Sequence, residues 1–169
     1  MALPAFAAEK ETASSHKLSE FSVGELITGP EANLQDTQGK AVVIEAWGVN
    51  CGPCIASLPH IEKIAKRNKD KMIVIGAHSQ NATDEQVKEV VKKNRLSYTI
   101  TKGMRGPVSS GGIPHAYVFN TKGELIFHGH PMDKDFDKAV RKATQGASSS
   151  SGSQRPSGLD SLKRPRTSS

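Results

Sequence analysis

Cysteine is scarce in this chain, and its scarcity excludes two classes of protein. The 169 residues include two cysteines, Cys51 and Cys54. One pair cannot form the disulfide framework of a small secreted scaffold, and no second pair is present to complete a four-cysteine zinc site. We therefore interpret the two thiols as reactive groups.

Aromatic residues are also few. They make up 5% of the chain, and they are not interleaved with basic residues in the pattern that stacks nucleic-acid bases. The formal net charge of +6 is scattered: part lies near the C-terminus, and part surrounds the end of a predicted helix, where cations interact favourably with the helix dipole. We expect no nucleic-acid partner.

Long hydrophobic runs are absent as well, since no apolar stretch approaches the length of a membrane helix. We expect no transmembrane segment. Residues 1–8 are apolar and end in an Ala-x-Ala pattern that resembles a signal-peptidase site, although a charged n-region is lacking. Two interpretations stay open: the remnant of a signal peptide, in a protein of the bacterial periplasm or a secreted one, and a flexible N-terminus, compatible with the cytoplasm.

Composition divides the chain into three segments. Residues 1–20 carry no sustained hydrophobic period and are expected to be flexible. Residues 21–145 have the composition of one soluble domain. Ser, Gly, Pro and Arg predominate in residues 146–169, which bury too little apolar surface to offset chain entropy and are expected to form a disordered tail.

Strand and helix signals alternate along the expected domain. Strands are predicted over 21–28, 41–47, 72–77, 98–101, 116–120 and 125–128. Pro53 suits the first turn of a helix because its missing N–H would have no partner there, and Thr83 with Gln86 forms a capping box for a second helix through about residue 93. A third helix is predicted over 134–144. This order predicts an α/β fold.

The motif Cys51-Gly52-Pro53-Cys54 lies between the strongest strand and the first helix. A thiol at a helix N-terminus faces unpaired N–H groups and the positive end of the dipole, which favour the thiolate. We therefore expect Cys51 to attack a disulfide and Cys54, one turn further in, to resolve the mixed disulfide. Gly52 and Pro53 keep the turn tight. A structural disulfide or half of a metal site is the alternative, and the metal site lacks its other ligands.

The segment from Glu45 to Cys54, followed by Pro59, resembles the active-site segment of the thioredoxin family, and Gly112-Ile113-Pro114-His115 resembles its cis-proline loop. The resemblance covers residues 21–144. It implies a thioredoxin fold, a central mixed sheet flanked by helices, here with an N-terminal β extension. An expected N-terminal hairpin and the long approach to Ile113 are most similar to the exported TlpA-like branch.

The resemblance implies a protein-disulfide reductase with redox-active cysteines and no cofactor or metal. Its substrates would be protein disulfides, and an upstream thiol reductant would restore the dithiol. We expect a monomer. Two alternatives stay open: an oxidase or isomerase, because the motif does not fix the direction of electron flow, and a non-catalytic thioredoxin-fold module that binds a partner or a soft metal ion.

The resemblance also implies roles for residues around the cysteines. Pro114 would be cis and lie against the cysteine pair, while the Ile113 backbone would bond an extended substrate. Glu45 stands where thioredoxins carry a buried aspartate that assists proton transfer from the resolving cysteine; an acid at the sheet edge that reaches solvent is the alternative. Trp47 is expected beneath the active-site turn, in the substrate-binding set with Gly52 and Pro53.

Three residues depart from the family pattern. Asn50 replaces the usual tryptophan before the first cysteine, Ser57 stands where many TlpA-like proteins have a glutamate, and His115 follows Pro114 where a small residue is common. A charged imidazole at His115 would stabilise a thiolate, and a half-exposed histidine without a role is the alternative. The other candidate histidines are interpreted as surface or satisfied ones: His60, His78, His128 and His130.

Overall fold

Six strands form a central mixed sheet in the order β2-β5-β4-β3-β7-β8 in the computed structural model, which describes residues 15–147. β3 pairs in parallel with β4, and β4 with β5, whereas β2, β7 and β8 join antiparallel. The strands are β1 (Ser22–Val23), β2 (Leu26–Thr28), β3 (Ala41–Trp47), β4 (Met72–His78), β5 (Thr99–Lys102), β6 (Met104–Arg105), β7 (His115–Phe119) and β8 (Leu125–Gly129). The predicted mixed sheet is confirmed.

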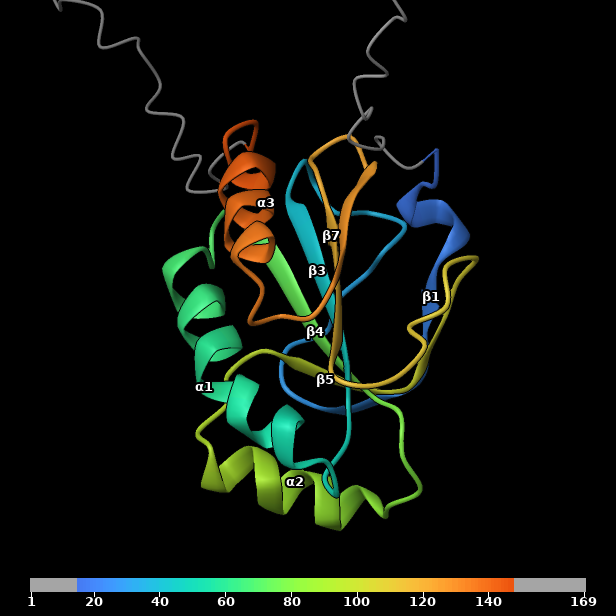
Figure 1. Ribbon diagram of the computed structural model, residues 1–169, viewed down its shortest axis with the longest axis vertical. Coiled ribbons are helices and arrows are strands. Elements are labelled where there is room, and N and C mark those ends of the chain that lie inside the picture. Colours follow the sequence, from blue (N-terminus) through green and yellow to red (C-terminus); the bar gives the residue numbers. More distant parts are fainter. Residues whose placement is uncertain (1–14, 148–169) are drawn as a thin grey trace, which may run out of the picture.

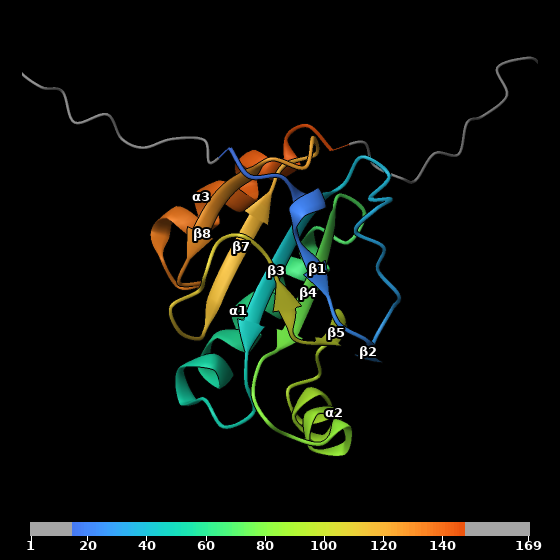
Figure 2. The same cartoon turned by 90° about the vertical axis from the view of Figure 1, so that its right-hand side faces the viewer.

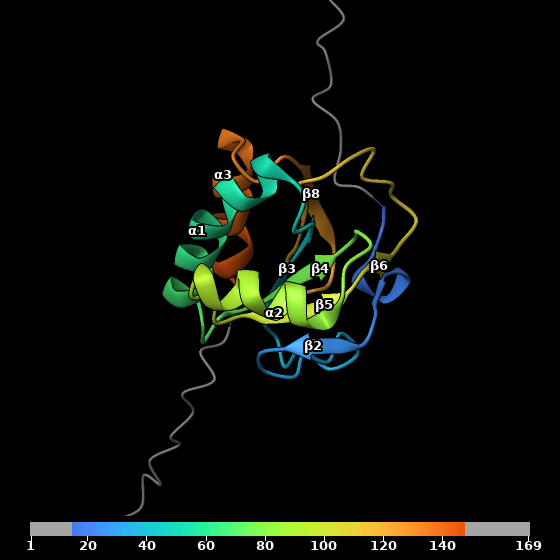
Figure 3. The same cartoon turned by 90° about the horizontal axis from the view of Figure 1, so that it is seen from below.

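Helices cover the two faces of this sheet unequally. α1 (Gly52–Arg67) and α3 (Lys134–Thr144) lie on one face, and α2 (Asp84–Lys93) lies across the lower end of the sheet in Figure 1, next to β2 (Figure 3). Figure 2 looks onto the opposite face, which β1 and a short 3-10 helix, Leu18–Glu20, cover. The flanking helices expected from the sequence are therefore present.

β3 is buried along its whole length, as its apolar sequence predicts. Because successive side chains of a strand point to opposite faces, β3 contributes to two cores. Val43 and Trp47 pack under α1 and α3, whereas Val42 and Ile44 pack with Phe21 on the other face. Glu45 has the parity of the α1 face, and this places the active-site acid under the helix that carries the cysteines.

The two N-terminal strands do not form the hairpin that we expected. β1 pairs with β6 in a separate two-stranded sheet, whereas β2 pairs with β5 at the edge of the central sheet. Gly24 lies between them, and its N–H donates to the carbonyl of Gly103 at 3.1 Å. A side chain at Gly24 would collide with the Lys102 backbone, so this close approach requires glycine. The N-terminal β extension is present, but its pairing is long-range.

The folded unit begins earlier than the boundary expected at residue 21. Leu18 is buried in the second core with Phe21, and its N–H donates to the Gly123 carbonyl at 2.7 Å. Lys17 forms a β-bridge with Glu124. Long-range pairing of this kind leaves no local hydrophobic period. Residues 1–14 of the expected flexible segment, and all but the first two residues of the expected tail, lie outside the described residues.

Local sequence signals account for the helices. Thr83 caps α2, and the predicted capping box with Gln86 is present. α1 continues through Pro59, and Figure 1 shows that its first turns run at an angle to the rest of the helix. A proline inside a helix removes one backbone hydrogen bond, which is a common origin of such bends.

Candidate active site

Cys51 and Cys54 form a disulfide at the N-terminus of α1, with their Cα atoms 5.1 Å apart. Cys51 is the N-cap residue in an extended conformation, and its Sγ accepts a hydrogen bond from the Cys54 N–H at 3.2 Å. Cys51 is partly exposed, whereas Cys54 is fully buried. The two sulfurs therefore differ in access, and an external disulfide can approach only one of them.

The Ile113–Pro114 peptide bond faces this disulfide and is cis, as the family resemblance implies. Cys51 Sγ lies 3.8 Å from the carbonyl oxygen of Ile113. Pro114 is buried and Ile113 is partly exposed, while Gly52 and Pro53 on the helix side are exposed. The cysteine turn and the proline loop thus lie together at one surface, at the lower end of the molecule in Figure 1.

Glu45 is fully buried behind the cysteines, so the alternative of an edge acid reaching solvent is wrong. Burial raises the pKa of its carboxyl to about 7, against a smaller opposing effect of a hydrogen bond from Ser57. At neutral pH, comparable fractions of Glu45 are protonated and ionised. A carboxyl in this condition can take up or release a proton.

Ser57 connects Glu45 to the second cysteine, a role that was not predicted from the sequence. Its Oγ lies 2.8 Å from Glu45 Oε1 and 2.8 Å from the carbonyl oxygen of Cys54. The hydroxyl has one proton, so it donates to only one of these acceptors at a time. The helical i, i+3 spacing from Cys54 was the available signal, because it puts both residues on the face of α1 that covers β3.

Trp47 does not contribute to a substrate-binding surface, which corrects its place in the expected substrate-binding set. Its side chain is fully buried and its ring meets the edge of His78 with centroids 5.3 Å apart. The expected packing beneath the active-site turn is confirmed. The strand period explains the correction, since it directs Trp47 into the core under α1.

Two residues at the end of β4 and just after it, His78 and Gln80, hold the active-site turn. Neither contribution was predicted from the sequence. His78 Nε2 accepts a hydrogen bond from the Val49 N–H at 3.3 Å, and Gln80 Oε1 accepts one from the Asn50 N–H at 2.8 Å. Burial lowers the pKa of His78, which fits a neutral imidazole that accepts. Parallel strands end at the same sheet edge, so the residues ending β4 were candidates for contact with the turn after β3.

His115 packs on the face of the sheet opposite α1. It pairs with Ala46 in register and packs against Tyr117, with ring centroids 4.9 Å apart, on the face opposite α1. Its Nε2 lies 3.2 Å from His128 Nδ1. Burial, and to a lesser extent His128 and His130, lower the pKa of His115. The lowered pKa disfavours the imidazolium that a thiolate-stabilising role would need.

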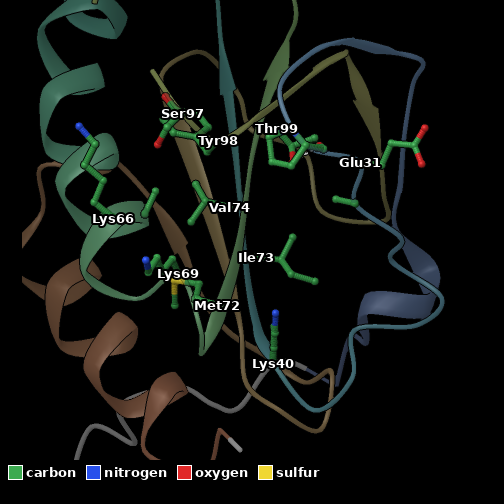
Figure 4. Close-up of a pocket in the computed structure, with 13 residues that line it drawn as sticks. Glu31, Lys40, Lys66, Lys69, Met72, Ile73, Val74, Ser97, Tyr98 and Thr99 are labelled. Carbon is green, nitrogen blue, oxygen red and sulfur yellow. Dashed lines mark hydrogen bonds between the residues drawn. The ribbon is translucent and has the colours of Figure 1, made fainter. Parts of the chain in front are cut away.

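The remaining candidate groups lie away from the cysteines. His60 Nε2 lies 2.9 Å from Asp137 Oδ1, between α1 and α3. Across residues 15–147, no three His, Cys, Asp or Glu side chains are grouped so as to hold a metal ion. A cavity of about 440 Å³ lies at the far end of α1, with Lys66, Lys69 and Met72 in its lining (Figure 4). The disulfide lies outside this cavity.

Comparison with known proteins gives consistent results. The Redoxin family model matches residues 3–128. The thiol-disulfide oxidoreductase ResA of Bacillus cereus is 29% identical over 125 residues, 72% of each chain. No helix within the described part of the chain is long and apolar enough to cross a membrane.

Solved structures share the fold at low sequence identity. A DsbF homologue from Corynebacterium diphtheriae has a TM-score of 0.65 at 21% identity, covering 73% of this chain and 84% of that one. A secreted disulfide oxidoreductase from Mycobacterium tuberculosis, homologous to DsbE of E. coli, has a TM-score of 0.56 at 18% identity, covering 72% and 95%. These similarities confirm the thioredoxin-like fold.

Proposed function

Since the chain belongs to the Redoxin family, we propose that it is a thiol-disulfide oxidoreductase that reduces disulfides in other proteins. The observation that carries this proposal is the Cys51–Cys54 disulfide itself, which joins a partly exposed sulfur at a helix N-terminus to a buried one. This arrangement suits one attacking and one resolving thiol.

The proposed reaction starts from the reduced dithiol. The Cys51 thiolate attacks one sulfur of a client disulfide, forms a Cys51–client disulfide and releases the other client sulfur as a thiolate. Cys54 then loses its proton and attacks Cys51 Sγ, which releases the second client thiolate and leaves the Cys51–Cys54 disulfide. Two electrons pass to the client, and an upstream dithiol reductant must return two electrons to the protein.

Two features support these assignments for the cysteines. The Cys54 N–H points at Cys51 Sγ at 3.2 Å, a hydrogen bond that favours a thiolate on Cys51. Glu45, buried and joined to the Cys54 carbonyl through Ser57, is the proposed acceptor of the Cys54 proton. Its pKa of about 7 suits proton exchange near neutral pH.

The proposed client-binding surface surrounds the exposed sulfur. Gly52 and Pro53 supply a low, exposed rim on one side. On the other side, Ile113 supplies backbone groups for an extended client segment, while cis Pro114 lies buried beneath it. The open surface favours protein clients over a small substrate enclosed in a cavity.

Replacing Cys54 with serine tests the assigned roles. The Cys54→Ser variant, mixed with a disulfide-containing protein such as insulin, is expected to accumulate one Cys51–client adduct per molecule, detected by mass spectrometry. The matched control Cys51→Ser is expected to form none, because the remaining sulfur is buried. Equal adduct yields in the two variants, or none in Cys54→Ser, would contradict the proposal.

The reduction potential tests the direction. A reductase is expected to have a value near the roughly −270 mV of thioredoxin, whereas a value near the roughly −120 mV of DsbA would identify an oxidase.

We further propose that the protein acts outside the cytoplasm. The Ala-x-Ala pattern near the N-terminus and the secreted structural neighbour support this location. Fractionation of the native cells, with the protein recovered only from the cytoplasm, would reject it.

A further inference from the structure

Three buried polar atoms on the α1 face of the sheet have no hydrogen-bond partner among the described residues. They are Glu45 Oε2, Trp47 Nε1 and Tyr98 OH. Buried polar atoms in proteins are nearly always paired. One of these atoms is a carboxylate acceptor and the other two carry donors, so their chemistry is complementary.

Gly76 brings these three groups together. It lies opposite Glu45 in the β3–β4 pair and opposite Ile100 in the β4–β5 pair. A Cβ at Gly76 would lie 2.9 Å from Trp47 Nε1 and 3.1 Å from Tyr98 Cε2. The indole and the phenol therefore occupy the space beside Glu45 that a larger residue at position 76 would fill.

The hydrogen bonds of Glu45 leave one carboxylate oxygen in need of a donor. Ser57 serves Oε1 with its single proton, and Oε2 has no partner. An ionised carboxylate accepts only, so burial makes ionisation costly until Oε2 also receives a hydrogen bond. The terminal torsion of glutamate is broad, which lets Oε2 turn toward a neighbouring donor.

Of the two unpartnered donors, the Tyr98 hydroxyl suits this role better than the Trp47 indole, because a hydroxyl proton can rotate toward an acceptor whereas an indole N–H is fixed in its ring. The titratable groups facing this region are Cys54 and Glu62 on α1 and His78 on β4, where His78 packs on Trp47. α2, α3 and β7 contribute apolar side chains: Val87, Val91, Phe136, Val140 and Ala116. Burial, then Glu45 and Glu62, raise the pKa of Tyr98 well above its usual range, so the phenol keeps its proton.

We propose that Tyr98 is a positioning residue for Glu45, whose hydroxyl donates to Oε2 of the ionised carboxylate and thereby keeps Glu45 able to accept the Cys54 proton. This inference rests on the proposed function, in which Glu45 takes up that proton. Tyr98 lies outside the cysteine turn and the proline loop, and the inference gives it a part in setting the pH range of the reaction.

Carbon-13 NMR of the Glu45 carboxyl in the oxidised protein tests the proposal without relying on activity. The Glu45 titration midpoint, about 7 in the wild type, is expected to rise by about one pH unit in Tyr98→Phe, because the ionised form loses a donor. Tyr117→Phe is the matched control. Tyr117 is also buried, but its hydroxyl donates to the Val108 carbonyl on the opposite face, so the midpoint is expected to stay unchanged.

An unchanged Glu45 midpoint in Tyr98→Phe would overturn the proposal. If that variant does not fold, a measurement on the wild-type protein still tests the proposal. The Tyr98 Cζ resonance is expected to titrate with the Glu45 midpoint and to lose this titration in Glu45→Gln, and a Tyr98 resonance that is flat through the midpoint would equally overturn it.

The rate of mixed-disulfide resolution separates this inference from the proposed function. In Tyr98→Phe the pH profile of this rate is expected to move upward together with the Glu45 midpoint. A moved midpoint with an unmoved rate profile would overturn the part of the proposal that concerns the Cys54 proton. Failure of the Cys54→Ser trap would reject the proposed function, while the NMR midpoints would still report the Tyr98–Glu45 interaction.

Discussion

The single proton of the Ser57 hydroxyl links the protonation of Glu45 to the end of α1 that carries the cysteines. When Glu45 is ionised, Ser57 donates to Oε1 and the Cys54 carbonyl loses that donor. When Glu45 is protonated, its own O–H can donate to Ser57 Oγ, and Ser57 is free to donate to the Cys54 carbonyl. Proton uptake by Glu45 therefore changes the hydrogen bonding of Cys54, whose thiolate attacks Cys51 in the resolving step.

Glu45 also predicts an unusual dependence of stability on pH. Its pKa is raised from 4.5 to about 7 in the folded protein, so between these values the unfolded chain binds fewer protons than the folded one. The contribution of Glu45 to stability is thus full below pH 4.5 and is lost as the pH rises through 7. At about 1.36 kcal/mol per pKa unit, the loss is about 3 kcal/mol.

Glu45→Gln is expected to remove this loss. Urea unfolding of the oxidised proteins should give similar free energies at pH 4.5, and at pH 8 the variant should be more stable than the wild type by about 3 kcal/mol. Its disulfide exchange should slow, since glutamine cannot take up the Cys54 proton. Parallel pH dependences of stability in the two proteins would refute the buried, ionising carboxyl.

At the scale of elements, β7 shows how strand alternation separates neighbouring residues. Pro114 ends the loop against the cysteines, while His115 turns to the opposite face and meets His128 of β8. Since the folded pKa of His115 is lowered, the unfolded chain binds more protons there, and the burial of His115 costs stability as the pH falls through the ordinary histidine range near 6.5.

Replacing His128 with alanine is expected to raise the pKa of His115, because it removes a neighbouring positive charge and exposes the ring. Proton NMR of the imidazole resonances measures this midpoint, and acid unfolding should begin at lower pH in the variant. His60→Ala is the matched control, since His60 lies between α1 and α3. A lowered or unchanged His115 midpoint in His128→Ala would contradict the pairing.

The elements around the cysteines were predictable because their signals are local. An apolar run, a Gly-Pro turn and a helical period give β3 and α1, and the family resemblance adds the cis peptide before Pro114 and the buried acid at Glu45. The pairing of β1 with β6 was not predictable, because two-residue strands choose partners through long-range packing.

The facing of side chains was the weakest part of the site prediction. The period of a strand is two, so an error of one position moves a side chain to the other face. Trp47 belongs to the core and His115 to the far face for this reason. The hydrogen bonds of His78 and Gln80 to the active-site turn depend on the order of the strands in the sheet, and no local sequence signal predicts that order.

At the scale of the whole molecule, the N-terminus of α1, which carries the disulfide, lies toward one end, and the described chain begins and ends at the other (Figures 1 and 2). The cavity lined by Lys66 and Lys69 also lies toward the end away from the cysteines. We propose residues 15–147 as the folded unit. A protein limited to these residues is expected to keep the disulfide-exchange activity of the full chain.

Leu18 tests where this unit begins. Its side chain is 5% exposed, buried among Phe21, Phe119 and Leu125, so Leu18→Ala is expected to lower the free energy of unfolding by about 2–5 kcal/mol. Leu26→Ala is the matched control, since Leu26 is 43% exposed and its loss should change stability within about 0.5 kcal/mol. Urea unfolding measures both variants. A Leu18→Ala protein as stable as the control would return the boundary to residue 21, because the segment before it would then contribute nothing to the core.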